Sequence, residues 1–175
     1  MRKLLNRELG RKSIEQYRKS EKSLFAIVLD NLRSHNNVGS VFRTADAFLT
    51  PKIYLCGITA RPPHRDIQKT ALGATESVAW EYYEKTLDAV GELKEKGYKI
   101  IGIEQTQDSV ELQNFVVEKD QRYALVFGHE VDGVAQEVID QCDMCVEIPQ
   151  FGTKHSFNIA VSTGIVLWEL NRGKK

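Results

Sequence analysis

Residues 148–169 read Ile-Pro-Gln-Phe-Gly-Thr-Lys-His-Ser-Phe-Asn-Ile-Ala-Val-Ser-Thr-Gly-Ile-Val-Leu-Trp-Glu. The stretch begins as a Pro/Gly loop and continues as a helix pattern with two apolar stripes. The stripes are Val161, Ile165 and Trp168, and Ile159, Val166 and Leu170. A helix that is apolar on most sides is expected to be buried, and the loop before it offers free backbone amides at a helix N-terminus. We therefore expect a ligand-binding loop followed by a packed helix, whose small residues suit a contact with another subunit.

Strand and helix patterns alternate through the preceding residues. Continuous apolar runs, typical of strands buried on both faces, predict strands at Phe25–Leu29, Ile53–Cys56, Tyr98–Ile103, Tyr123–Phe127 and Met144–Ile148. Amphipathic segments predict helices at Asn37–Phe48, Thr86–Lys96 and Val134–Ile139. The prolines and arginines between Gly57 and Ile67 indicate a loop. This alternation predicts an α/β fold with a parallel sheet and helices on both faces.

The overall composition is typical of one globular domain. The chain has 175 residues, of which 42% are hydrophobic and 27% charged. Its apolar runs are shorter than the roughly 20 residues that span a bilayer. The first residues lack the apolar region of a signal peptide. We expect a cytoplasmic protein without a membrane partner.

Positive charge is concentrated at the N-terminus, although the net charge is zero. Residues 1–22 contain eight Lys or Arg and three Glu. They predict a basic helix or arm in front of a domain at residues 23–175, with Leu5, Leu9, Ile14 and Tyr17 as docking residues. The charge pattern alone fits phosphate contacts and a solvated helix equally well.

The chain contains three cysteines, Cys56, Cys142 and Cys145. An odd number without a secretory signal implies no disulfide framework. Cys142 and Cys145 form a C-x-x-C pair, but the pair runs into a predicted strand and has no second pair at zinc-finger spacing. We interpret these side chains as small buried groups and expect no metal site.

Two further motifs accompany the C-terminal stretch. Asn37-Val-Gly-Ser-Val-Phe-Arg43 follows the first strand, and Gly128-His-Glu-Val-Asp-Gly133 follows the strand that ends at Phe127. In the order N-x-G-x-x-x-R, G-x-E-x-x-G and I-P-x-x-G-x-x-x-S-x-N, the chain resembles the SpoU/TrmH family of RNA ribose 2′-O-methyltransferases, in the SPOUT class. The resemblance runs from about Ser23 to the C-terminus. It implies S-adenosylmethionine as cofactor, a homodimer, and a C-terminal trefoil knot.

The resemblance also assigns catalytic residues. They are Arg43, Asn37, Glu130, Ser156 and Asn158. A guanidinium is a poor base because its pKa exceeds about 12. We therefore expect Arg43 to be necessary for catalysis, by clamping an RNA phosphate and orienting the ribose, without itself taking the proton. Asn37, Ser156 and Asn158 are also expected to cap helices, and Glu130 to favour a helix N-terminus.

The cofactor is expected to bind largely through backbone groups of loops. The matching positions are Glu104, Gln105, Gly128, Ile148, Gln150, Phe151, Gly152, Ser156 and Phe157. Gln150 and Lys154-His155 depart from the apolar or small acidic residues that are more common in this loop. We interpret His129 and His155 as loop-packing or RNA-contact residues rather than general bases, and we place His35 and His64 near a surface that could touch RNA.

Transfer RNA is the expected substrate, because the chain shows no separate domain for reading ribosomal RNA in front of the catalytic one. Ribosomal RNA remains an alternative. A catalytically silent RNA-binding protein of the same fold is another, against which the intact catalytic motifs argue. A small-molecule α/β enzyme with Cys or His chemistry would need a nucleophile elbow or a paired Cys/His context, and the sequence shows neither.

Overall fold

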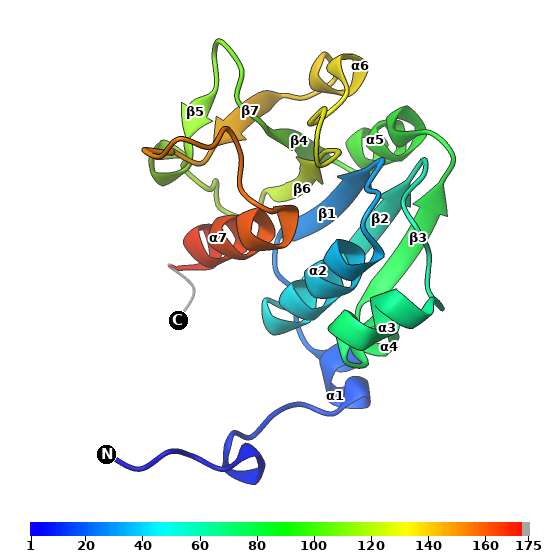
Figure 1. Cartoon of the computed structure of the whole chain (residues 1–175), viewed down its shortest axis with the longest axis vertical. Coiled ribbons are helices and arrows are strands. Elements are labelled where there is room, and N and C mark those ends of the chain that lie inside the picture. Colours follow the sequence, from blue (N-terminus) through cyan, green and yellow to red (C-terminus); the bar gives the residue numbers. More distant parts are fainter. Residues whose placement is uncertain (173–175) are drawn as a thin grey trace.

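A computed structural model describes residues 1–172, without the side chain of Asn6, so the end of the domain expected at residues 23–175 lies outside the described residues. Its centre is a seven-stranded sheet in which every pair is parallel, with the order β3-β2-β1-β6-β4-β7-β5 (Figure 1). The strands are β1 (Phe25–Asp30), β2 (Lys52–Cys56), β3 (Ala79–Tyr83), β4 (Tyr98–Ile103), β5 (Val110–Glu111), β6 (Arg122–Phe127) and β7 (Met144–Glu147). The helices are η1 (Asn6–Glu8), α1 (Ile14–Lys19), α2 (His35–Ala47), α3 (Arg65–Ala71), α4 (Ala74–Ser77), α5 (Thr86–Glu95), η2 (Leu112–Asn114), α6 (Gln136–Ile139) and α7 (Ile159–Asn171).

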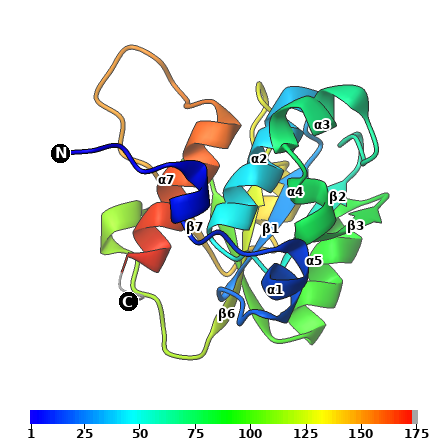
Figure 2. The same ribbon diagram turned by 90° about the horizontal axis from the view of Figure 1, so that it is seen from below.

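Both faces of the sheet are covered by helices. Along β1, Phe25, Ile27 and Leu29 pack with α2, α3, α4 and α7, while Ala26 and Val28 pack with α5 and α6. All these strand residues are fully buried, which explains why the strand is apolar without alternation. Figures 1 and 2 show the two helical layers on opposite sides of the sheet. The predicted α/β fold is confirmed, whereas the knot stays a prediction.

Helix α2 begins earlier than the sequence indicated. Its N-cap is Ser34, whose hydroxyl accepts a hydrogen bond from the Asn37 amide at 3.2 Å. The expectation that Asn37 caps this helix was therefore wrong, and its side chain is free for another role. Gly39 lies against α3, where an added Cβ would stand 2.3 Å from the Ile67 carbonyl oxygen. That glycine lets the two helices approach closely.

Helix α7 is only partly buried in the single chain. Ile159, Val166 and Leu170, together with Thr163 and Leu167, face the interior. The other stripe lies at the surface, with Val161 50% and Trp168 64% exposed. The prediction that the whole helix is buried was thus wrong for one stripe of this chain. The sequence pattern could not separate a stripe that faces the core from one that faces outward.

The N-terminal arm docks through α1, where Arg18 donates a side-chain hydrogen bond to the Glu76 carbonyl oxygen at 2.6 Å. Tyr17 on α1 is buried, and its hydroxyl donates a hydrogen bond to the Thr50 carbonyl oxygen at 3.2 Å. Leu5, Leu9 and Ile14 are exposed, so their predicted docking was wrong. Figures 1 and 2 show the first residues extending from the body of the protein.

Several short elements were not predicted. Helix α3 begins at Arg65 inside the predicted loop, with His64 as N-cap, and β3 lies at the sheet edge.

Cys142 and Cys145 pack against Gly102, and burial raises the pKa of both thiols, that of Cys142 to about 12. Within residues 1–172, no cluster of His, Cys, Asp or Glu suited to a metal ion is found. Over the same residues, no helix has the length and apolar character needed to cross a bilayer.

Candidate active site

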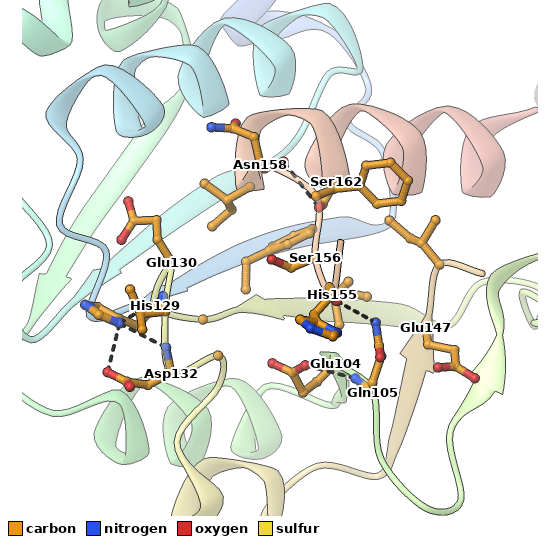
Figure 3. A pocket seen from close by; sticks show the side chains of 18 of the residues that line it. Glu104, Gln105, His129, Glu130, Asp132, Glu147, His155, Ser156, Asn158 and Ser162 are labelled. Atoms are coloured by element: carbon orange, nitrogen blue, oxygen red, sulfur yellow. Dashed lines mark hydrogen bonds and ion pairs between the residues drawn. The ribbon is translucent and has the colours of Figure 1, made fainter. Parts of the chain in front are cut away.

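A pocket of about 510 Å³ lies at the carboxyl ends of the central strands β6, β4 and β7. Three loops form it: the one that follows β4, the one that follows β6, and the one that joins β7 to α7. Figure 3 shows their side chains converging beneath the N-terminus of α7. The carboxyl edge of a parallel sheet is the usual place for a ligand site, and this volume suits a small organic ligand.

The pocket brings together most of the residues expected from the sequence. Those that line it are Glu104, Gln105, Gly128, Glu130, Ile148, Gln150, Ser156, Phe157 and Asn158. Phe151 and Gly152 do not line it, and the Phe151 side chain is 98% exposed. Their assignment to cofactor binding therefore stays a prediction, because in this structure neither residue lies at the pocket.

A chain of hydrogen bonds joins three of the expected catalytic residues. The Asn158 side-chain amide donates to Asn37 Oδ1 at 3.1 Å, and Asn37 Nδ2 donates to Glu130 Oε1 at 3.2 Å. Glu130 also accepts from the backbone amides of Arg33 at 3.1 Å and Ser34 at 3.0 Å. The loops after β1, β6 and β7 are thereby tied together at the rim of the pocket.

The Glu130 carboxylate is stabilised in its charged form. Partial burial alone raises its pKa, but the hydrogen bonds from the Arg33 and Ser34 amides and from Asn37 outweigh burial, and the net pKa is lower than that of an ordinary glutamate. The Glu130 carboxylate thus accepts hydrogen bonds from backbone amides at the start of α2, where the dipole of the helix favours a negative charge.

Helix capping explains Asn158 but not Ser156. Asn158 Oδ1 accepts from the Ala160 amide at 2.9 Å and so begins α7, as expected. Ser156 lies in the preceding loop, exposed and lining the pocket, so its expected capping role was wrong. Its hydroxyl is available to a ligand in the pocket.

Two buried or half-buried carboxylates fix the loop that carries Glu130. Glu104 Oε2 accepts from the Val134 amide at 3.0 Å, and Asp30 Oδ2 accepts from the Ala135 amide at 3.0 Å. Gly128 packs so closely on this turn that an added Cβ would stand 2.1 Å from the Val134 nitrogen. The turn itself needs a glycine, because Gly133 has φ +71° and faces the Glu104 carboxylate.

Glutamine side chains hold the loop between β7 and α7. Gln105 Nε2 and Gln150 Nε2 both donate to the His155 carbonyl oxygen, at 3.1 Å and 3.3 Å. Gln105 and Gln150 therefore shape the pocket mouth, whichever ligand it takes.

The His129 ring stabilises its own turn, because Nδ1 accepts from the Asp132 amide at 3.2 Å. This contact agrees with the interpretation of His129 as a loop-packing residue.

Arg43 lies away from the pocket. It is exposed on α2 and lines a second hollow of about 490 Å³ between the N-terminal arm, α2 and the residues around α4. Within the described residues of the single chain, Arg43 does not line the first pocket. Its catalytic role stays a prediction.

The charge of the pocket suits a cationic ligand. Its described lining includes the carboxylates of Glu104, Glu130, Asp132 and Glu147 and contains neither Lys nor Arg. S-adenosylmethionine carries a positive sulfonium and a positive ammonium group against one carboxylate. The pocket volume, its loop backbone and its negative lining therefore fit this cofactor.

Sequence reasoning missed the residues that support this site from behind. Asp30 is buried, accepts from the Thr86 hydroxyl as well as from Ala135, and ends a strand that was read only as core. The one signal was a charged residue at the end of an apolar run. Ser34, which caps α2 and donates its amide to Glu130, stands three residues before the start expected for that helix.

Comparison with known proteins agrees with this site. A family model described as the SpoU rRNA Methylase family matches residues 24–168. The chain therefore belongs to the SpoU rRNA methylase family, and the resemblance predicted from the three motifs is confirmed.

Relatives with assigned names are longer than this chain. A 23S rRNA (guanosine-2′-O-)-methyltransferase RlmB of Neisseria meningitidis serogroup B is 36% identical over 151 residues, which cover 83% of this chain and 57% of the relative. A Staphylococcus aureus protein named as a TrmH family tRNA/rRNA methyltransferase is 28% identical over 159 residues, 91% of this chain and 63% of the relative. The chain thus spans about three fifths of the length of these relatives.

Solved structures share the fold. An AdoMet-bound rRNA methyltransferase of Sinorhizobium meliloti superposes with a TM-score of 0.81 at 26% identity, covering 89% of this chain and 58% of that one.

Proposed function

We propose that the protein transfers a methyl group from S-adenosylmethionine to the 2′-hydroxyl of a ribose in RNA. The observation that carries the proposal is the hydrogen-bonded chain of Asn158, Asn37 and Glu130 at the rim of a carboxylate-lined pocket. Membership of the SpoU rRNA methylase family and the names of the relatives support it.

The residues of the site have separable tasks in this proposal. Bound S-adenosylmethionine supplies an electrophilic methyl carbon on its sulfonium. Glu104, Gly128 and the pocket-lining residues of the loop between β7 and α7 hold the cofactor. Hydrogen bonds among Asn37, Glu130 and Asn158 fix the three loops relative to one another, so that the ribose oxygen and the methyl carbon are aligned. With the cofactor bound, these residues would orient the hydroxyl so that its oxygen takes the methyl group, its proton passes to water or to a nearby RNA phosphate, and the sulfur is left as a neutral thioether.

We further propose that the working form is a homodimer. The stripe of Val161, Ile165 and Trp168 on α7 is apolar, and two of its members are at least half exposed in the single chain. Burying large aromatic and aliphatic side chains against a second copy removes this apolar area from water. A role for Arg43 in the reaction then requires an RNA that extends from the pocket to α2, or a pocket supplied by the second copy.

Transfer RNA is the proposed substrate, and ribosomal RNA is the second candidate because the Neisseria meningitidis relative is named for 23S rRNA. The test uses the purified protein with labelled S-adenosylmethionine and separate pools of unmodified transfer RNA and ribosomal RNA. Label in transfer RNA supports the first candidate, and label confined to ribosomal RNA supports the second. Cofactor binding measured by calorimetry, with no label in either pool, contradicts both substrate assignments.

A further inference from the structure

Two histidines that the pocket does not use are stacked on each other at the surface. The ring centroids of His35 and His64 are 4.0 Å apart, and the ring planes are inclined by 26°. His35 is the first residue of α2 and His64 is the N-cap of α3, two helices that lie side by side in Figure 1. Both residues are partly exposed, so the pair presents aromatic surface to solvent.

One hydrogen bond orients this pair. His64 Nδ1 accepts from the Asp66 amide at 3.2 Å, which places the ring proton of the neutral imidazole on Nε2. The cap requires only an acceptor at this position, and an Asn side chain serves equally well. The choice of a histidine therefore adds a ring that the cap does not need.

Three arginines lie close to the pair in the sequence, Arg33 two residues before His35, and Arg61 and Arg65 on either side of His64. Arg33, Arg61 and Arg65 are exposed, and the only acidic residue between positions 57 and 69 is Asp66. The Arg61 guanidinium carbon lies 4.3 Å from the centre of the Tyr82 ring, which fixes a second flat surface in the same loop region. Arginines interleaved with aromatic rings favour contacts with unstacked bases and with phosphates.

The patch adjoins the proposed methyl-transfer site. The Arg33 amide, two residues before His35, donates to Glu130 Oε2 at 3.1 Å, and Glu130 lines the pocket. An RNA whose ribose reaches the pocket therefore passes close to the start of α2.

We propose that the stacked imidazoles of His35 and His64, flanked by Arg61 and Arg65, form a platform on which an unpaired base of the RNA substrate stacks. The inference rests on the proposed function, since it assigns the RNA-recognition surface of the same site. The arginines contact the phosphates on either side of that base. The platform selects single-stranded or loop regions, because a paired base cannot offer its face.

The test measures binding of the full-length protein to pools of unmodified transfer RNA and ribosomal RNA at several salt concentrations. The combined change His35→Ala and His64→Asn removes both rings and keeps the cap. It should weaken RNA binding by about tenfold, within the range for loss of one base stack, without changing the salt dependence. His35→Trp with His64→Asn supplies a new ring and should restore most of the affinity.

Replacing the arginines tests the second half of the proposal. Arg61→Gln with Arg65→Gln should weaken binding and lower the slope of log K against log salt by about 1.4, which is roughly 0.7 for each lost phosphate contact with a single strand. Cofactor affinity and Tm should match the wild type in all variants.

Three results overturn the inference. The first is an RNA affinity that does not fall in the double-histidine variant. The second is an affinity that falls only in step with Tm and does not recover when Trp replaces His35. The third is a wild type that binds S-adenosylmethionine and no RNA. Only the last of these also contradicts the proposed function, so the two failures are distinguishable.

Discussion

Replacing Glu130 by Gln tests directly whether the hydrogen bonds of its carboxylate stabilise the loops of the site. The carboxylate accepts three hydrogen bonds, from the Arg33 and Ser34 amides and from Asn37. The side-chain oxygen of Gln can still accept from the Ser34 amide and from Asn37, but these two hydrogen bonds are then to a neutral group. The NH₂ group of Gln faces the Arg33 amide, so the third hydrogen bond is lost. A hydrogen bond to a charged group contributes about 1.5–3 kcal/mol, against about 0.5–1.5 kcal/mol for a neutral one. Glu130 is only partly buried, and solvent screening weakens these charged bonds, so we expect the free energy of unfolding to fall by about 2 kcal/mol, less than the sum of the full values.

The assay is urea unfolding at pH 7 and at several acid pH values. Glu130 has a folded-state pKa below its ordinary value of 4.5, so its stabilisation is present above that value and is lost as the pH falls through the folded-state pKa. The difference between wild type and variant should therefore narrow in acid. Exposed Glu84 provides the matched control, because Glu84→Gln should change stability by less than about 0.5 kcal/mol. A Glu130→Gln protein as stable as the wild type at pH 7 would refute the bracing role.

Three further predictions concern the pocket, Arg43 and the outer stripe of α7. Gly128→Ala places a Cβ 2.1 Å from the Val134 nitrogen and should weaken S-adenosylmethionine binding at least tenfold, measured by calorimetry, whereas Gly152→Ala, which meets nothing within 4 Å, should not. Arg43→Ala should lower methyl transfer by about a hundredfold or more with cofactor affinity unchanged; equal activity would remove Arg43 from the mechanism. Trp168→Glu should convert a dimer into a folded monomer in sedimentation velocity, and a wild type that sediments as a monomer would contradict the proposed assembly.

The buried strands and the site loops were predictable because their signals are local. β1 is buried on both faces and reads as an unbroken apolar run, and Gly128 and Asn158 stand where the chain must turn or begin a helix. β3 escaped notice because Trp80 and Tyr82 alternate with the exposed Ala79 and Glu81 at a sheet edge, over too few residues to form a pattern.

The rest depended on contacts between distant residues. The partners of Glu130 lie more than ninety residues away, at the start of α2, and no spacing in the sequence joins them. Likewise, Val161 and Val166 are equally apolar, yet one is half exposed and the other fully buried. Burial of a helix face is decided by what packs against it, and within the described residues of one chain Val161 and Trp168 stay exposed.

The central claim is tested most directly by nucleoside analysis of RNA methylated by the protein. Unmodified transfer RNA and ribosomal RNA are incubated separately with labelled S-adenosylmethionine, digested to nucleosides and separated, with Asn37→Ala as the comparison variant. We predict that the wild type places the label on a 2′-O-methylnucleoside and that Asn37→Ala, which breaks the link between Asn158 and Glu130, yields much less of it. Label on a base, or equal ribose methylation by the variant, would contradict the account.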